Sequence, residues 1–171
     1  MTKRYYRIGI ALAVIGIIGI LIYLATQFSH YADDTLGGWP DRTFPISKQK
    51  LEKAIDTLYS YNPEYKVPAK WKEEDSSIMK SYFYLPSKTF YFNDPEEMYY
   101  VTFIGDSTML ADSTKITIAI RSVNYDGYSW SRYVDIKDTS ERMRIEKRFD
   151  NEIISRLEKY TKTQAVKGAS D

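Results

Sequence analysis

The sequence predicts an α+β domain that follows a single N-terminal transmembrane helix. Three observations lead to this prediction: an uncharged apolar run over residues 8–28, an amphipathic helical pattern at each end of the remaining chain, and aromatic-rich strand patterns between them. Strands joined by short turns pair antiparallel, and each helix has one apolar stripe to bury. We therefore expect two layers, in which an antiparallel meander of about five strands packs with an N-terminal helix and a long C-terminal helix.

The apolar run at residues 8–28 is long enough to cross a bilayer. As a helix it would rise roughly 31 Å at about 1.5 Å per residue, and the hydrocarbon core is about 30 Å thick. The flank at residues 1–7 carries Lys3, Arg4 and Arg7, whereas the stretch after the run is acidic. The positive-inside rule therefore predicts a cytoplasmic N-terminus and an extracytoplasmic C-terminal domain.

A cleaved signal peptide is the alternative interpretation of this run. Such a peptide has an apolar region of about 7–15 residues followed by a small-x-small cleavage site. Here the run is longer, no good cleavage site follows it, and the absence of cysteine excludes lipoprotein anchoring. We expect an uncleaved helix that binds the lipid bilayer. Because the chain also lacks an Asn-x-Ser/Thr acceptor, a bacterial inner membrane with the domain in the periplasm is the favoured location.

The chain after the anchor divides into three parts. Residues 29–46 are expected to form a juxtamembrane linker, because they contain glycine and proline and lack apolar periodicity. Residues 47–162 are assigned to the domain and residues 163–171 to a flexible tail. Ser47 is the expected N-cap of the first helix, whose apolar face holds five residues. These are Leu51, Ala54, Ile55, Leu58 and Tyr59.

Alternation and turn residues predict the strands and the final helix. Strands are expected at residues 78–85, 89–92, 98–104, 115–123 and 128–136. The clearest alternation is in the fourth of these strands, where Ile116, Ile118 and Ile120 point to one face and Arg121 to the other. A final helix is expected from about residue 139 to about residue 160. Its apolar face would comprise Met143, Ile145, Phe149, Ile153, Ile154, Leu157 and Tyr160.

The charge balance argues against a nucleic-acid partner. When the three basic residues of the N-terminal tail are set aside, 21 basic and 23 acidic residues remain. A part of the chain so nearly neutral lacks the basic surface that binds phosphate backbones.

The sequence carries no catalytic, cofactor or metal-binding motif, and we expect no cofactor. The sole histidine, His30, lies at the membrane exit, so a Ser-His-Asp triad cannot form inside the domain. A weak metal site combining His30 with Asp33 and Asp34 is the alternative to a solvated linker. Acids that could in principle hydrolyse glycosides all lie in or beside predicted turns, where acids are common. They are Glu73, Glu74, Asp75, Glu96, Glu97, Asp106 and Asp112.

A tight turn near residue 126 is the candidate contact surface. Tyr125, Tyr128 and Trp130 surround it, and aromatic side chains held by a turn are low-entropy anchors for a protein or glycan partner. The alternative is that Tyr128 and Trp130 pack under the final helix. The sequence thus predicts a non-enzymatic, membrane-anchored binding or accessory protein with a protein partner. A toxin-neutralising protein of the immunity type and a small carboxylate-dependent envelope hydrolase are the alternatives.

The topology is directly testable. Alkaline phosphatase fused to the C-terminus should be active, because the basic flank places everything after about residue 30 outside the cytoplasm. Mass spectrometry of the mature protein should find an N-terminus at Met1 or Thr2. An inactive fusion, or an N-terminus near residue 30, would contradict the predicted uncleaved anchor.

Overall fold

The computed structural model describes residues 38–81, 85–125, 127 and 129–168, without the side chains of Met79 and Ser81. The expected anchor at residues 8–28 and Tyr128 lie outside the described residues. Among the described helices, none combines the length and apolar character that a bilayer span requires.

In chain order the elements are β1 (Arg42–Phe44), α2 (Lys48–Tyr61), η1 (Pro63–Tyr65), η2 (Ala69–Trp71), α3 (Lys72–Ser81), β2 (Ser87–Asn93), β3 (Glu96–Ile104), α4 (Ser107–Ala111), β4 (Ile116–Asn124), η3 (Tyr133–Asp135), α5 (Thr139–Phe149), η4 (Asp150–Ile154), α6 (Ser155–Thr161) and β5 (Val166–Lys167).

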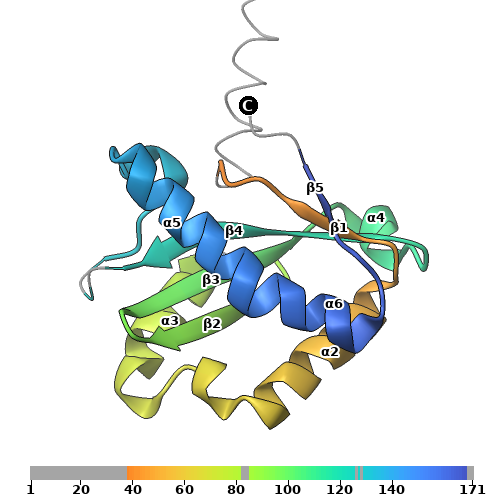
Figure 1. The fold of residues 1–171 in the computed structure, drawn as a ribbon, viewed down its shortest axis with the longest axis horizontal. Coiled ribbons are helices and arrows are strands. Elements are labelled where there is room, and N and C mark those ends of the chain that lie inside the picture. Colours follow the sequence, from red (N-terminus) through yellow and green to blue (C-terminus); the bar gives the residue numbers. More distant parts are fainter. Residues whose placement is uncertain (1–37, 82–84, 126, 128, 169–171) are drawn as a thin grey trace, which may run out of the picture. The chain divides into compact units, whose positions relative to one another are not determined.

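Five strands form one antiparallel sheet in the order β2-β3-β4-β1-β5 (Figure 1). The predicted α+β class is confirmed. The sheet is not the expected meander, because the first strand, β1, lies between β4 and β5. The central strands β3 and β4 pair from Met98↔Asn124 to Ile104↔Thr117, with a bulge at Tyr100/Val101.

Two of the predicted strands are wrong. The strand expected at residues 78–85 overlaps α3, whose first turn carries three acids that stabilise the positive end of a helix dipole. The return strand expected at residues 128–136 is reduced to an isolated bridge between Val123 and Ser131, followed by η3. Aromatic residues therefore misled the prediction at both places.

The two predicted amphipathic helices cover one face of the sheet. Helix α2 begins after Ser47, whose hydroxyl accepts the backbone N–H of Lys50 at 3.3 Å, as the sequence predicts. Segments α5, η4 and α6 form one continuous helix that crosses the sheet (Figure 1). Both helices bury their apolar stripes against the strands. The buried residues of these stripes are Leu51, Ala54, Ile55, Leu58, Ile145, Phe149, Ile153, Ile154 and Leu157.

A π-helical turn in the middle of the C-terminal helix keeps its apolar stripe on the sheet. Buried residues recur every fourth position, at Ile145, Phe149, Ile153 and Leu157. Because an α-helix has 3.6 residues per turn, such a stripe would rotate away from the sheet along the helix. The wider turn of η4 compensates for part of this rotation. Met143, which the sequence assigns to the apolar face, is 65% exposed, so that assignment is wrong.

The second half of the expected linker belongs to the fold. Residues 42–44 form β1, and Trp39, Phe44 and Ile46 are buried in the core. Trp39 packs edge-on against Tyr133, with 5.0 Å between the ring centroids. Gly38 has a φ of +74°, and a Cβ there would come within 3.0 Å of the Tyr133 side chain. Because residues 37–45 have the composition of a linker, the sequence did not predict the three-residue strand β1.

The expected C-terminal tail also contributes to the sheet. Lys162 ends α6 with a φ of 57°, and the chain returns so that β5 pairs with β1. Gly168 then donates its N–H to the carbonyl oxygen of Asp41 at 3.0 Å. A Cβ at position 168 would come within 1.8 Å of the Asp41 carboxylate, so a larger residue there would require the Asp41 side chain to shift.

Helix α3 covers the other face of the sheet, so the expectation of two layers is wrong (Figure 1). The Thr89 hydroxyl on β2 donates to Asp75 of α3 at 2.6 Å, and the Trp130 indole donates to the carbonyl oxygen of Glu74 at 3.3 Å. Arg121, on the face of β4 opposite to Ile116, Ile118 and Ile120, is 5% exposed. Helices therefore lie on both faces of the sheet.

Two buried charges on the strands hold the C-terminal helix in place. Arg42 of β1 is 3% exposed and pairs with Glu146 at 2.8 Å and Asp150 at 2.7 Å. On β3, Glu97 is 2% exposed and pairs with Arg144 and Arg148. These two sets of contacts are called the Arg42 clamp and the Glu97 clamp below.

Candidate functional site

Three of the acids considered as catalytic candidates have structural partners. Glu97 accepts hydrogen bonds from Tyr99, Arg144 and Arg148 inside the Glu97 clamp. Asp106 accepts the backbone N–H of Met109 and caps α4, and Asp112 accepts from the backbone and hydroxyl of Thr114. Each of these acids thus stabilises a turn, a cap or an ion pair.

The acids of α3 occupy the first turn of that helix. Asp75 accepts the Thr89 hydroxyl, and the backbone carbonyl of Glu74 accepts the Trp130 indole. Glu73 is exposed. The structure therefore places these three acids in different surroundings.

The predicted aromatic contact surface is divided between the two sides of the sheet. Tyr125 is half-buried and packs against the main core, whereas Trp130 is half-buried and meets Tyr100 edge-on at 6.3 Å. Trp130 therefore packs toward α3 and not toward the C-terminal helix. Tyr128 lies outside the described residues.

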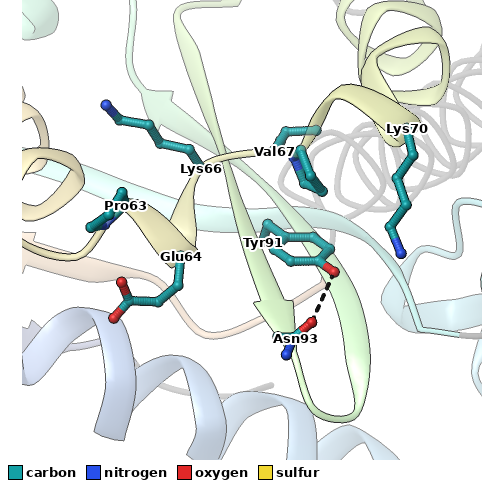
Figure 2. Close-up of a pocket in the computed structure, with 8 residues that line it drawn as sticks. Pro63, Glu64, Lys66, Val67, Lys70, Tyr91 and Asn93 are labelled. Carbon is teal, nitrogen blue, oxygen red and sulfur yellow. Dashed lines mark hydrogen bonds between the residues drawn. The ribbon is translucent and has the colours of Figure 1, made fainter.

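A groove that the sequence did not predict runs beside β2 (Figure 2). It has a volume of about 480 Å³ and is bounded by residues of η1 and the segment after it on one side and by β2 on the other. Half of its eight lining residues are aliphatic or aromatic, and the other half are two lysines, one glutamate and one asparagine. The residues are Pro63, Glu64, Lys66, Val67, Pro68, Lys70, Tyr91 and Asn93.

A fixed polar network supports the β2 side of this groove. Glu96, the first residue of β3, accepts hydrogen bonds from Tyr91 at 2.5 Å and from the Trp71 indole at 2.8 Å. Lys70 lies 2.5 Å from the same carboxylate oxygen. Figure 2 shows the Tyr91 ring in the groove, with its hydroxyl also 3.4 Å from the Asn93 side-chain oxygen. The ring is thereby held in one orientation.

The network also shifts the pKa values of two of its members. Hydrogen bonds from Lys70, Tyr91 and Trp71 lower the pKa of Glu96 to about 2. Burial, together with the bond to the Glu96 carboxylate, raises the pKa of Tyr91 to about 12. At neutral pH Glu96 is therefore an anion and Tyr91 a neutral donor.

A second hollow of about 370 Å³ adjoins the groove and shares Lys66 and Val67 with it. Tyr59 of α2 lines this hollow and donates its hydroxyl to the carbonyl oxygen of Thr89 at 2.9 Å. Burial raises the pKa of Tyr59 above its ordinary value. The two hollows together extend along much of β2, an edge strand of the sheet.

The groove has the composition of a binding surface. Among its lining residues Glu64 is the one carboxylate, and its side chain accepts from Asn62 at 3.2 Å. Within the described part of the chain, no group of three or more His, Cys, Asp or Glu side chains is placed to hold a metal ion. Aliphatic side chains, a fixed aromatic ring and a small number of polar groups are features of ligand-binding grooves.

Sequence analysis missed the groove because its walls are separated by more than twenty residues and share no motif. The one available signal was the pair of prolines at positions 63 and 68, which interrupts helical structure between α2 and α3. The sequence pointed to Glu96 only as a candidate catalytic acid, not as part of a groove.

Comparisons with known proteins give no relative of this chain: no protein-family model, no characterised protein and no solved structure matches it significantly.

The low pKa of Glu96 predicts a specific acid response. A carboxylate whose folded-state pKa is depressed stabilises the fold above its ordinary pKa, and this contribution is lost as the pH falls from about 4.5 to about 2. Glu96→Gln should therefore be less stable than the wild type at pH 6, and the difference should shrink across that interval. Urea unfolding at several pH values measures it.

Glu73→Gln is the matched control for this experiment, because Glu73 is an exposed glutamate. Because Glu73 lies in the first turn of α3, this change should lower stability by no more than about 1 kcal/mol. A stability difference for Glu96→Gln that stays constant down to pH 2 would contradict the role assigned to the network.

Proposed function

We propose that this chain is a single-pass membrane-anchored binding protein of the cell envelope, which docks a protein partner in the groove beside β2 and catalyses no reaction. The apolar run at residues 8–28 and its basic flank support the anchoring, and they favour a domain held on the extracytoplasmic side. The groove supports the docking. An anchored domain meets membrane partners at a high effective concentration, so a modest surface is sufficient.

The observation that carries the docking proposal is a preformed aromatic and aliphatic groove with a rigid wall. Tyr91 is held by Glu96 and Asn93, so binding would not have to order this ring. Val67 and Pro68 supply apolar contact on the opposite wall, and Lys66 supplies an exposed charge at the rim. Central aromatic and aliphatic groups with a charged rim are the usual composition of a protein-docking site.

The engagement of the acids supports a non-catalytic role. A glycoside hydrolase needs two carboxylates about 5–9.5 Å apart on either side of its substrate. Glu97 is enclosed by two arginines, and Glu96 by a lysine, a tyrosine and a tryptophan. The lowered pKa of Glu96 is the opposite of the raised pKa that a general acid requires.

The turn with Tyr125, Tyr128 and Trp130 remains the second candidate contact surface of this function. Tyr125 and Trp130 keep part of their side chains exposed. Because Tyr125 and Trp130 pack on opposite sides of the sheet, each would give a partner a separate rigid contact.

Site-specific crosslinking in cells tests the docking site. Lys66, which is exposed at the groove, is replaced by p-benzoylphenylalanine in the full-length chain and the cells are irradiated. A discrete, light-dependent adduct with one protein is expected, because a partner in the groove would lie within reach of the probe. Mass spectrometry of the adduct identifies the partner.

Lys53, an exposed lysine of α2 that does not line the groove, is the matched control and should give no adduct. The same probe at Tyr125 tests the alternative surface. Adducts at Tyr125 with none at Lys66 would move the docking site to the turn, and equal adducts at all three positions would contradict a specific docking site.

A further inference from the structure

Each wall of the groove has one aromatic ring behind it. Phe92 of β2 lies directly between two groove residues in the sequence and is 2% exposed, and Tyr65 of η1 lies between two others and is 5% exposed. Both rings belong to the hydrophobic core. They meet edge-on, with 5.7 Å between their centroids. The separation of the two walls therefore depends on what holds these two rings in place.

Arg148 of α5 reaches both rings. Its guanidinium lies 4.5 Å from the centroid of the Phe92 ring. Its Nε donates to one carboxylate oxygen of Glu152 at 3.0 Å, and the other oxygen accepts the Tyr65 hydroxyl at 3.2 Å. Arg148 thus contacts the β2 wall directly and the η1 wall through one carboxylate.

The other nitrogens of Arg148 hold the turn between β2 and β3. Nη1 donates to the carbonyl oxygen of Pro95 and Nη2 to that of Asp94, each at 2.8 Å. Nη1 also donates to Glu97 at 2.8 Å, which fixes the guanidinium against β3. The turn leads directly into Glu96, the acid that orients the tyrosine ring of the groove.

We propose that Arg148 is the positioning residue of the groove, which sets the separation of its two walls and the orientation of the Tyr91 ring without touching the docked partner. This inference rests on the docking function proposed above. Arg148 does not line the groove, and its side chain is 11% exposed. A guanidinium presents five N–H donors in a fixed, planar fork, so one side chain holds the turn, Glu97 and Glu152 at once.

Crosslinking in an Arg148→Lys background tests this role. Lysine keeps the positive charge but loses the planar fork. With p-benzoylphenylalanine at Lys66 of the full-length chain, the light-dependent adduct should fall several-fold, because the walls are no longer preorganised for the partner. Arg144→Lys is the matched control, since Arg144 also binds Glu97 but otherwise donates to Glu141 on its own helix, and it should leave the adduct unchanged.

The pKa of Glu96 is a second readout, and it needs no partner. Carbon-13 NMR of the side-chain carboxyl should give about 2 in the wild type. In Arg148→Lys the pKa should rise toward its ordinary value of 4.5, because the turn before Glu96 loses its bonds and the carboxylate its fixed donors. Arg144→Lys should leave this pKa near 2.

Glu152→Ala separates the two walls and serves as the second variant if Arg148→Lys does not fold. It removes the link to Tyr65 but leaves the bonds to the turn, so the adduct should fall while the pKa of Glu96 stays near 2. Adducts as strong as in the wild type in both variants would overturn the positioning role and leave the docking site standing. No adduct in the wild type would overturn the docking proposal, and an unchanged Glu96 pKa in Arg148→Lys would then overturn the positioning role as well.

Discussion

The position of the C-terminal helix depends on two charged side chains that point from the sheet into the core. Arg42 on β1 and Glu97 on β3 carry opposite charges, and the helix presents acids to the first and arginines to the second. Rotation of the helix about its axis would bring like charges together in a low-dielectric interior, at a cost of several kcal/mol. The two clamps therefore specify one orientation of the helix, while the apolar stripe supplies most of the burial.

The same helix holds both walls of the groove. Arg148 of the Glu97 clamp donates to the carbonyl oxygens of Asp94 and Pro95, in the turn between Asn93 and Glu96. On the other wall, Tyr65 of η1 bonds Glu152 at 3.2 Å and Arg156 at 3.3 Å. The groove is thus shaped by contacts that reach it from the far end of the chain. A groove built in this way is held by contacts across the fold and needs no disulfide, which this cysteine-free chain lacks.

Periodicity predicted the parts of the fold that are long enough to show it. Helix α2, the C-terminal helix and strands β3 and β4 were predicted within a few residues of their bounds. Strands β1 and β5 have three and two residues, which are too few to show an alternating pattern. Their formation depends on pairing with neighbouring strands of the sheet. The groove could not be predicted, because it forms where the segment before α3 meets β2, and no local pattern encodes that meeting. The sequence singled out Glu97 as an acid of interest. It did not predict the two arginine partners of Glu97, because they lie about fifty residues away along the chain.

A double-mutant cycle on the Arg42 clamp tests the central claim most directly. The free energy of unfolding is measured for the wild type, Arg42→Met, Asp150→Leu and the double variant in the full-length protein. If the buried pair positions the helix, the coupling energy between the two residues should be at least about 1.5 kcal/mol, as for other close charge pairs. Effects that add to within about 0.5 kcal/mol would show that the two side chains act independently and would contradict the clamp.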